Sequence, residues 1–495
     1  MNTIHNLLIQ AKMRQTSITR EILDPTRKAL FINLDDSIYG SFAEIGAGQE
    51  VARCFFQSGG ASGTVARTIS AYDMQFSNSL YGKSPSGRYV SEQRLMQMLD
   101  IEFKSLMDLL SDKRGEHTRF FAFANTVTTL NFKKDNDPHG WIGVRFQLNP
   151  GDPPNDVILH VRLLENDSLL QQKTLGILGV NLIYACYYNY LYPNSFLRSL
   201  MESISDDRIE IDMMRMSGPE LDYVDNRLLA VQLVKNGMTN VTMFDRHGKV
   251  QQPSDLLYKK HTMVLRGSFR PITYVGFDML KSGFALFKDD VGFDKKNTVV
   301  LCEMTLNNLM GGGDFDERDF LDRVDVLCGM GQNVMISNFR EFYKLAEWFR
   351  RFRMGSIRMV IGAYTFQNVI DKRYYAHLRG GILEAFGKLF IENLKVYIYP
   401  SRENEQSPII TIANMPVGKD VKPLYKFLVE NSFIVDIPGY REQALPFFSH
   451  IVLKKIKEND PGWEKMVPRY VSSFIKSKNL FGYGAPKKRG RAAKK

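Results

Sequence analysis

Apolar residues in the N-terminal part of the chain recur first at helical spacing and then in strand-like runs. Between Leu95 and Leu110, leucine and phenylalanine follow one another at three- and four-residue steps, which predicts an amphipathic helix over 91–110. Three apolar runs come next and predict strands, at 119–127, 140–148 and 157–164. The Pro- and Gly-rich stretch 149–155 favours an antiparallel turn between the last two. A helical run over 171–190 follows, so we expect a mixed α+β region here.

From residue 208 onward, short β-rich runs alternate with amphipathic helical patterns. The runs that predict strands are 209–214, 241–244, 262–265, 298–304, 333–337, 358–361 and 395–399. Helical spacing lies between them, at 224–236, 274–287, 317–328, 341–351 and 381–389. Strands that alternate with helices predict βαβ units and a mostly parallel sheet. We favour a doubly wound open sheet, and a closed barrel with one further strand is the alternative.

These patterns divide the chain into four parts. They are an N-terminal α+β domain (1–205), a parallel βα domain (206–405), a C-terminal helical and extended section (406–483), and a basic tail (484–495). In a parallel sheet, ligands bind at the carboxyl ends of the strands. The residues that follow the expected strands are therefore candidates: Asp245, Arg246, His247, Arg266, Gly267, Ser268, Glu303, Thr305, Ser337, Asn338, Gly362, Tyr364, Tyr399, Ser401 and Arg402.

The composition is that of an ordinary globular protein and excludes several other classes. Hydrophobic residues make up 44% and charged residues 24% of the 495 positions. No run approaches the roughly 20 apolar residues of a membrane-spanning helix, and the N-terminus lacks the apolar core of a signal peptide, so we expect a cytoplasmic protein. The 4 cysteines include no C-x-x-C pair, which argues against a disulfide framework or a structural zinc site.

Positive charge is concentrated at the C-terminus. The net charge is +11. Residues 487–495 contain no acidic residue and six basic ones: Lys487, Lys488, Arg489, Arg491, Lys494 and Lys495. A segment so poor in large apolar residues predicts a mobile arm. Its Arg-Gly-Arg core is similar to a minor-groove hook, and six cations would bind nucleic acid in a salt-dependent way. A solubilising tail is the alternative interpretation.

The segment 266–276 has the most specific local pattern. It follows an expected strand and opens an expected helix, and a small-residue turn at a helix N-terminus presents free N–H groups to a phosphate. The segment resembles the G-x-F-x-P-x-[HT]-x-G-H signature of nucleotidylyltransferases that make nicotinate or nicotinamide dinucleotides. The matching positions are Gly267, Phe269, Pro271 and Thr273. Val275 and Gly276 stand where the signature has glycine and its second histidine.

The resemblance implies a phosphate site on this segment. In that family the His or Thr holds the nucleotide phosphates, which would be Thr273 here, and Arg266 and Arg270 are the candidates to neutralise charge. We therefore take as nucleotide-binding candidates Arg266, Gly267, Ser268, Phe269, Arg270 and Thr273. A purely structural strand-to-helix turn is the alternative.

The whole chain also resembles a poorly characterised group of bacterial proteins of similar length. The likeness is carried by 42–51 (FAEIGAGQEV) and 380–387 (GGILEAFG). Members are often labelled nicotinate- or nicotinamide-nucleotide adenylyltransferases, so the resemblance implies adenylyl transfer from ATP, with Mg²⁺ to shield the phosphates. We expect a nucleotide-binding protein and, if it is an enzyme, a nucleotidyltransferase. The alternative is a non-catalytic scaffolding or nucleic-acid-associated protein tethered by its basic arm.

Other small patterns give secondary candidates. Gly46 and Gly48 lie in an acidic-x-Gly-x-Gly loop similar to that of methyltransferases, although glycines of a tight turn are the favoured interpretation. His160 with Arg162, and Glu210 with Asp212, share strand faces because side chains alternate. The first pair could hold phosphate, and the carboxylate pair could serve acid–base chemistry or bind Mg²⁺. The acidic stretch 314–317 lacks calcium-loop spacing, and we predict a helix cap there and no metal site.

Overall fold

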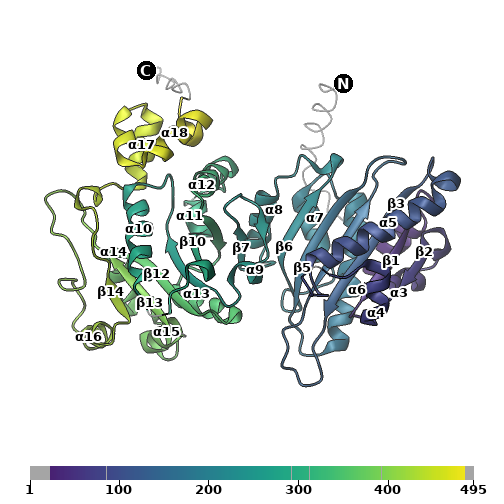
Figure 1. Cartoon of the computed structure of the whole chain (residues 1–495), viewed down its shortest axis with the longest axis horizontal. Helices are drawn as coiled ribbons and strands as arrows, with labels where there is room; N and C mark the ends of the chain where they lie inside the picture. Colours follow the sequence, from purple (N-terminus) through teal and green to yellow (C-terminus); the bar gives the residue numbers. More distant parts are fainter. Residues whose placement is uncertain (1–22, 85, 291, 312, 392, 485–495) are drawn as a thin grey trace, which may run out of the picture. The chain divides into compact units, whose positions relative to one another are not determined.

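The computed structural model describes residues 23–484 except positions 85, 291, 312 and 392, and divides into two compact units (Figure 1). The first unit extends to Glu210 and includes Met216–Tyr223. The second consists of Ile211–Arg215 and the chain from Val224 onward. Each unit is built around its own open sheet. The α/β fold is therefore confirmed, and neither of the two sheets is a closed barrel.

The sheet of the first unit has the strand order β2-β1-β3-β4-β5-β6. Its strands are β1 (Ile38–Ile45), β2 (Val65–Ile69), β3 (Arg119–Thr128), β4 (His139–Phe146), β5 (Asn155–Leu163) and β6 (Ile209–Ser217). β1 pairs in parallel with β2 and β3, whereas β3–β4 and β4–β5 are antiparallel. The expected strands at 119–127, 140–148 and 157–164 and the antiparallel turn between the last two are confirmed.

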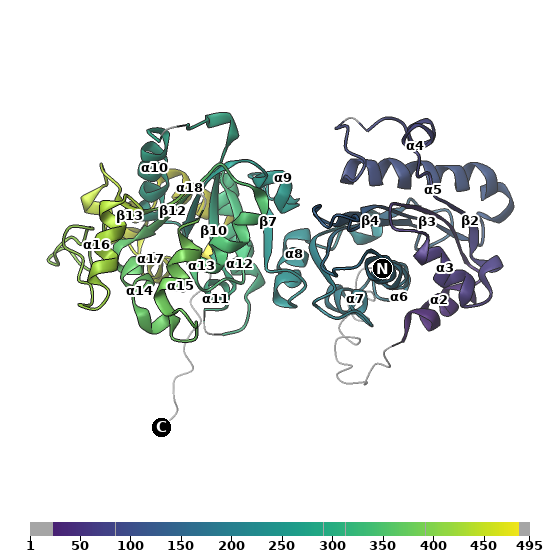
Figure 2. The ribbon, with the colours of Figure 1, turned by 90° about the horizontal axis from the view of Figure 1, so that it is seen from below.

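Helices cover both faces of this sheet. They are α2 (Pro25–Asn33), α3 (Glu50–Gln57), α4 (Met74–Tyr81), α5 (Glu92–Arg114), α6 (Ser168–Tyr188) and α7 (Pro193–Leu200). Figure 2 shows α4 and α5 on one face and α2, α3 and α6 on the other. Ser91 caps the start of helix α5, its hydroxyl accepting from the Arg94 amide, and the helix ends among basic residues. Its apolar stripe is buried, as the spacing predicts, and the helix continues to Arg114.

The sheet of the second unit has the strand order β14-β13-β12-β9-β10-β11-β7-β8. Its strands are β7 (Val241–Phe244), β8 (Val250–Gln251), β9 (His261–Arg266), β10 (Thr298–Thr305), β11 (Asn333–Ser337), β12 (Ser356–Gly362), β13 (Leu394–Tyr399) and β14 (Ile434–Asp436). The strands from β14 to β11 in this order pair in parallel. Strand β7 is antiparallel to β11 and to β8. The doubly wound open sheet is therefore confirmed.

Helices connect these strands and form the C-terminal part. They are α8 (Asn226–Lys235), α9 (Pro253–Leu257), α10 (Tyr274–Lys288), α11 (Leu306–Met310), α12 (Glu317–Gly329), α13 (Phe342–Phe349), α14 (Ala363–Val369), α15 (Gly381–Leu389), α16 (Lys422–Glu430), α17 (Ser449–Glu458) and α18 (Arg469–Lys478). Helices α13, α14 and α15 pack on the strands in one buried apolar cluster that includes Phe349, Phe366 and Phe386. The expected helices at 274–287, 317–328 and 381–389 are confirmed within one residue at each end.

Two expectations about strand placement are wrong. The run 209–214 forms β6 at the edge of the first sheet and not a strand of the second. The run 241–244 forms β7, which is antiparallel to β11, and a tight hairpin, closed by the Asp245 amide on the Lys249 carbonyl, leads from it into β8. Within 406–483, β14 adds to the parallel sheet beside β13.

Candidate functional site

The direction of chain winding reverses between β9 and β12 in the second sheet. From β9 the chain proceeds outward through β10 and β11, and from β12 it proceeds the other way through β13 and β14. This is the 3-2-1-4-5-6 order in which ligands bind outside the carboxyl ends of the strands at the reversal point. The loop that leaves β9 at this point is 267–273, the segment that the sequence singled out.

Arg266, the last residue of β9, forms a buried ion pair with Glu303 of β10. Its Nε and Nη2 atoms donate to the two carboxylate oxygens of Glu303, both at 2.8 Å. Its Nη1 atom donates to the Arg340 carbonyl, and the guanidinium lies 4.2 Å from the centre of the Phe342 ring. The Ser337 hydroxyl donates to the same carboxylate at 2.6 Å. Arg266 therefore fixes the carboxyl edge of the sheet, and three of its N–H groups are already bonded.

The loop backbone is anchored at several points. The Gly267 amide donates to the Glu303 carbonyl at 3.0 Å. Phe269 has a positive φ of 46° and a buried ring, and the Pro271 carbonyl accepts a hydrogen bond from the Ser449 hydroxyl of α17 at 2.9 Å. Arg323 of α12 donates to the Ser268 carbonyl at 3.2 Å. The loop is thus held from β10, α12 and α17, which gives the start of α10 a fixed position.

Arg270 shares the carboxylate of Asp319 with Arg323. Its Nε atom donates to Asp319 at 2.6 Å, and Arg323 pairs with the other oxygen. The Arg323 side chain is fully buried, and burial lowers the pKa of its guanidinium despite the neighbouring Asp319. The Arg270 side chain is 33% exposed. Among the candidates in this loop, Arg270 is therefore the cation that can still reach a ligand.

Thr273 stands at the N-cap position of helix α10, and its side chain makes no capping hydrogen bond to the amides of the helix. The first amides of a helix have no intrahelical partner and carry the positive end of its dipole. The exposed Arg441 guanidinium lies 5.5 Å from the centre of the Tyr274 ring in the first turn. Asp278, one turn further, accepts from the Arg441 amide at 2.8 Å and from the Tyr399 hydroxyl at 2.7 Å. The start of α10 thus combines the positive end of the helix dipole with the Arg441 guanidinium, beside the buried Asp278 carboxylate.

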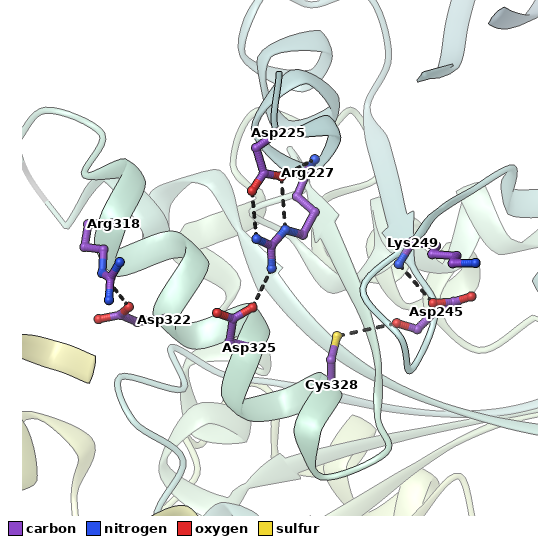
Figure 3. Close-up of polar contacts among 8 residues, drawn as sticks. All are labelled: Asp225, Arg227, Asp245, Lys249, Arg318, Asp322, Asp325 and Cys328. Carbon is purple, nitrogen blue, oxygen red and sulfur yellow. Dashed lines mark hydrogen bonds and ion pairs between the residues drawn. The ribbon is translucent and has the colours of Figure 1, made fainter. Parts of the chain in front are cut away.

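The polar contacts behind α12 are structural. Figure 3 shows Arg227 of α8 between Asp225 and Asp325, so that α8 is tied to α12. Cys328 donates to the Asp245 carbonyl at 3.4 Å, and burial raises the pKa of its thiol to about 11. Arg318 pairs with Asp322 at 3.0 Å. The Arg227 and Cys328 contacts hold the helix that carries Asp319 and Arg323, and the Arg318–Asp322 pair lies within it.

The secondary glycine candidates lie in the first unit after β1. Gly46 has a φ of +96°, and a Cβ there would lie 1.9 Å from the Val127 carbonyl oxygen, so both conformation and space require glycine. Gly48 also has a positive φ. The buried Glu44 carboxylate accepts from the Val51 and Ala52 amides of α3 and from Asn125. The acidic residue of this loop thus caps a helix of its own unit.

The secondary candidates on strands β5 and β6 lie in contact with other polar or aromatic side chains or are buried. His160 is buried, its Nε2 atom lies 3.1 Å from Nδ1 of His139, and its ring packs on Trp141. Arg162 pairs with Glu210 of β6 at 3.1 Å and with Asp137 at 3.0 Å. Asp212 is buried. The Arg162–Glu210 ion pair joins one member of each predicted pair across neighbouring strands.

The structure bears only in part on the expectations about the basic tail, a metal site and a membrane-spanning helix. The basic residues 487–495 lie outside the described residues, and a nucleic-acid partner stays a prediction of the sequence. Within the described part of the chain, no group of three His, Cys, Asp or Glu side chains is arranged to hold a metal ion. No helix among the described residues is both long and apolar enough to cross a membrane.

The sequence did not indicate that Arg441, Asp319 and Arg323 lie near the β9–α10 loop, at the carboxyl edge of the second sheet. Arg441 comes from a section expected to be separate from the sheet, and it lies near α10 because the chain after β14 returns over that helix. Asp319 and Arg323 stand four residues apart on the predicted helix 317–328, a spacing that indicates a shared face but not its neighbour.

Comparison with known proteins gives only weak likenesses. No family model matches the chain, and no curated protein sequence matches it. Competence/damage-inducible protein CihA from Agrobacterium tumefaciens is 19% identical, with a TM-score of 0.24 over 34% of this chain and 98% of that one. A Vibrio parahaemolyticus protein assigned as a nicotinate-nucleotide adenylyltransferase is 15% identical, with a TM-score of 0.23 over 45% of this chain and 95% of that one. These scores are too low to indicate a function, so a function has to be inferred from the geometry of the site.

Proposed function

We propose that the protein binds a nucleotide at the carboxyl edge of its second sheet, with the phosphates at the N-terminus of α10. The observation that carries the proposal is the reversal of strand order between β9 and β12, where the β9–α10 loop is located. Free amides of the first turn, the accessible Arg270 and the exposed Arg441 support an anionic ligand. A rigidly anchored loop also lowers the entropy lost on binding.

Glu303 restricts how such a ligand would be held. In dinucleotide-binding sheets, an acidic residue beyond the first βα loop bonds the ribose hydroxyls. Here the Glu303 carboxylate, at the end of β10, is already bonded to Arg266 and Ser337. The proposal is therefore for recognition through phosphate, with no ribose contact from this carboxylate.

We expect Arg270→Ala to weaken nucleotide binding roughly tenfold or more, because a charge-assisted hydrogen bond contributes about 1.5–3 kcal/mol. Calorimetric titration with ATP, with and without Mg²⁺, and with nicotinate mononucleotide measures the change. Arg227→Ala is the matched control: Arg227 is also partly buried and paired with aspartates, but lies on α8. Equal losses in the two variants, or no binding by the wild type, would contradict the proposal.

A narrower proposal is adenylyl transfer from ATP to a nicotinate or nicotinamide mononucleotide. It rests on the match of 266–276 to the nucleotidylyltransferase signature, in which Gly276 takes the position of the second histidine. In this reaction a phosphate oxygen of the mononucleotide bonds to the α-phosphorus of ATP, and pyrophosphate leaves. Release of pyrophosphate with both substrates and Mg²⁺ would support transfer. Binding without release would leave a nucleotide-binding protein that lacks this reaction.

A further inference from the structure

A cavity of about 740 Å³ lies in the second unit, between α10, the connection from α12 to β11, and the start of α18. Its walls include Phe277 and Phe284 of α10, Met330 after α12, and Tyr470 of α18. The end of α12 and the start of β11 belong to the amino edge of a parallel sheet, opposite the edge at which the β9–α10 loop lies. The cavity extends along α10 from the amino edge to Phe277 in the first turn of the helix, and no residue of the β9–α10 loop lines it.

The lining of this cavity is mostly apolar but carries charge of one sign. Lys281 and Lys288, both exposed on α10, are its charged residues, and no carboxylate lines it. They stand two helical turns apart, about 10 Å along the axis, with Phe284 between them. Among the described residues, neither lysine has an ion-pair partner, and the Lys288 ammonium lies 5.1 Å from the centre of the Phe284 ring. An apolar pocket flanked by two unpaired ammonium groups fits an amphipathic anion.

We propose that this cavity binds a free medium-chain fatty carboxylate, with the hydrocarbon chain against Phe277, Phe284 and Met330 and the carboxylate at Lys281 or Lys288. The volume lies within the roughly 300–1,000 Å³ typical of small-ligand cavities lined by apolar side chains with a few polar groups. Burial of the chain supplies the affinity, and the lysines select the charge of the head group. The basic C-terminal residues 487–495 are a poor occupant, because they carry the same sign of charge as the two lysines.

The test is a calorimetric titration of the full chain with three decyl-chain probes below micelle-forming concentrations. They are decanoate, decanol and decyltrimethylammonium, which share a chain of ten carbons and differ in the head group. We expect decanoate to bind at least tenfold more tightly than the other two. The double variant Lys281→Met/Lys288→Met keeps the aliphatic stems and should lose that preference. Lys426→Met/Lys454→Met is the control, since these exposed lysines of the same unit each pair with a glutamate four residues on.

A second variant tests whether decanoate binds in the cavity. Ala285, an exposed lining residue of α10, can be enlarged to tryptophan at the cavity without change to the buried core. Ala285→Trp should abolish decanoate binding and leave nucleotide binding unchanged. Decanoate affinity that survives Ala285→Trp, equal affinity for all three probes, no binding at all, or binding only to anionic phospholipid vesicles would each overturn the proposal.

Discussion

Replacing Glu303 with alanine is expected to destabilise the second unit by roughly 3–5 kcal/mol, the usual cost of removing one partner of a buried ion pair. The Glu303 side chain is fully buried, and its partner Arg266 is only 11% exposed. Without the carboxylate, the Arg266 guanidinium keeps only its bond to the Arg340 carbonyl, and the Ser337 hydroxyl loses its acceptor. The charge left behind, more than the lost attraction, accounts for the size of the effect.

Urea unfolding followed by tryptophan fluorescence measures this change. In a Trp141→Phe background the two remaining tryptophans, Trp348 and Trp463, both belong to the second unit. Glu303→Gln keeps an acceptor oxygen and should cost less than Glu303→Ala. The double variant Arg266→Met/Glu303→Leu removes both charges and should also cost less than Glu303→Ala, because no unpaired charge stays buried. If the unfolding free energy of Glu303→Ala lay within 0.5 kcal/mol of the parent value, the ion pair would not stabilise the second unit in this way.

This ion pair illustrates what the sequence could and could not predict about the site. The reversal-point loop 267–273 was found from a strand end, a small-residue turn and a helix start, all of which are local signals. Two other features result from tertiary packing. Arg266 pairs with a carboxylate 37 residues away, and the Ser449 hydroxyl bonds to the Pro271 carbonyl across 178 residues. A basic residue beside a glycine gives no sign of whether its charge is free. The role of the loop residues toward a ligand stays a prediction.

The same division between local and distant signals explains the fold. Strands β9 to β13 were predicted to within two residues at each end, because each is a short apolar run flanked by a helix with clear periodicity. Strand β7 has the same appearance in sequence, but it pairs antiparallel with β11 and β8, and a strand pattern does not specify the direction of pairing. Strand β6 was assigned to the wrong sheet because a strand pattern does not specify its neighbour.

The stability of the first unit is expected to fall as the pH rises from 5 to 8, because of Glu44. Burial raises the pKa of this carboxyl from the ordinary 4.5 to about 7, although the Val51 and Ala52 amides and Asn125 favour its charged form. The native state therefore binds more protons than the unfolded state between these values. The stabilising contribution is full below pH 4.5 and is lost as the pH rises through 7. At 1.36 kcal/mol per pKa unit, it amounts to about 3 kcal/mol.

Glu44→Gln, which cannot ionise, should remove this slope from the unfolding free energy. Trp141 reports on the first unit when Trp348 and Trp463 are replaced by phenylalanine. Asp100→Asn is the control, since the Asp100 side chain is 70% exposed and pairs with Arg145 at the surface of the same unit, and the slope should survive it. If the parent instead gains stability relative to Glu44→Gln as the pH rises, then the three donors keep the carboxylate ionised throughout. Glu44 would in that case be a permanent charged cap of α3, because the hydrogen bonds of its loop outweigh the cost of its burial.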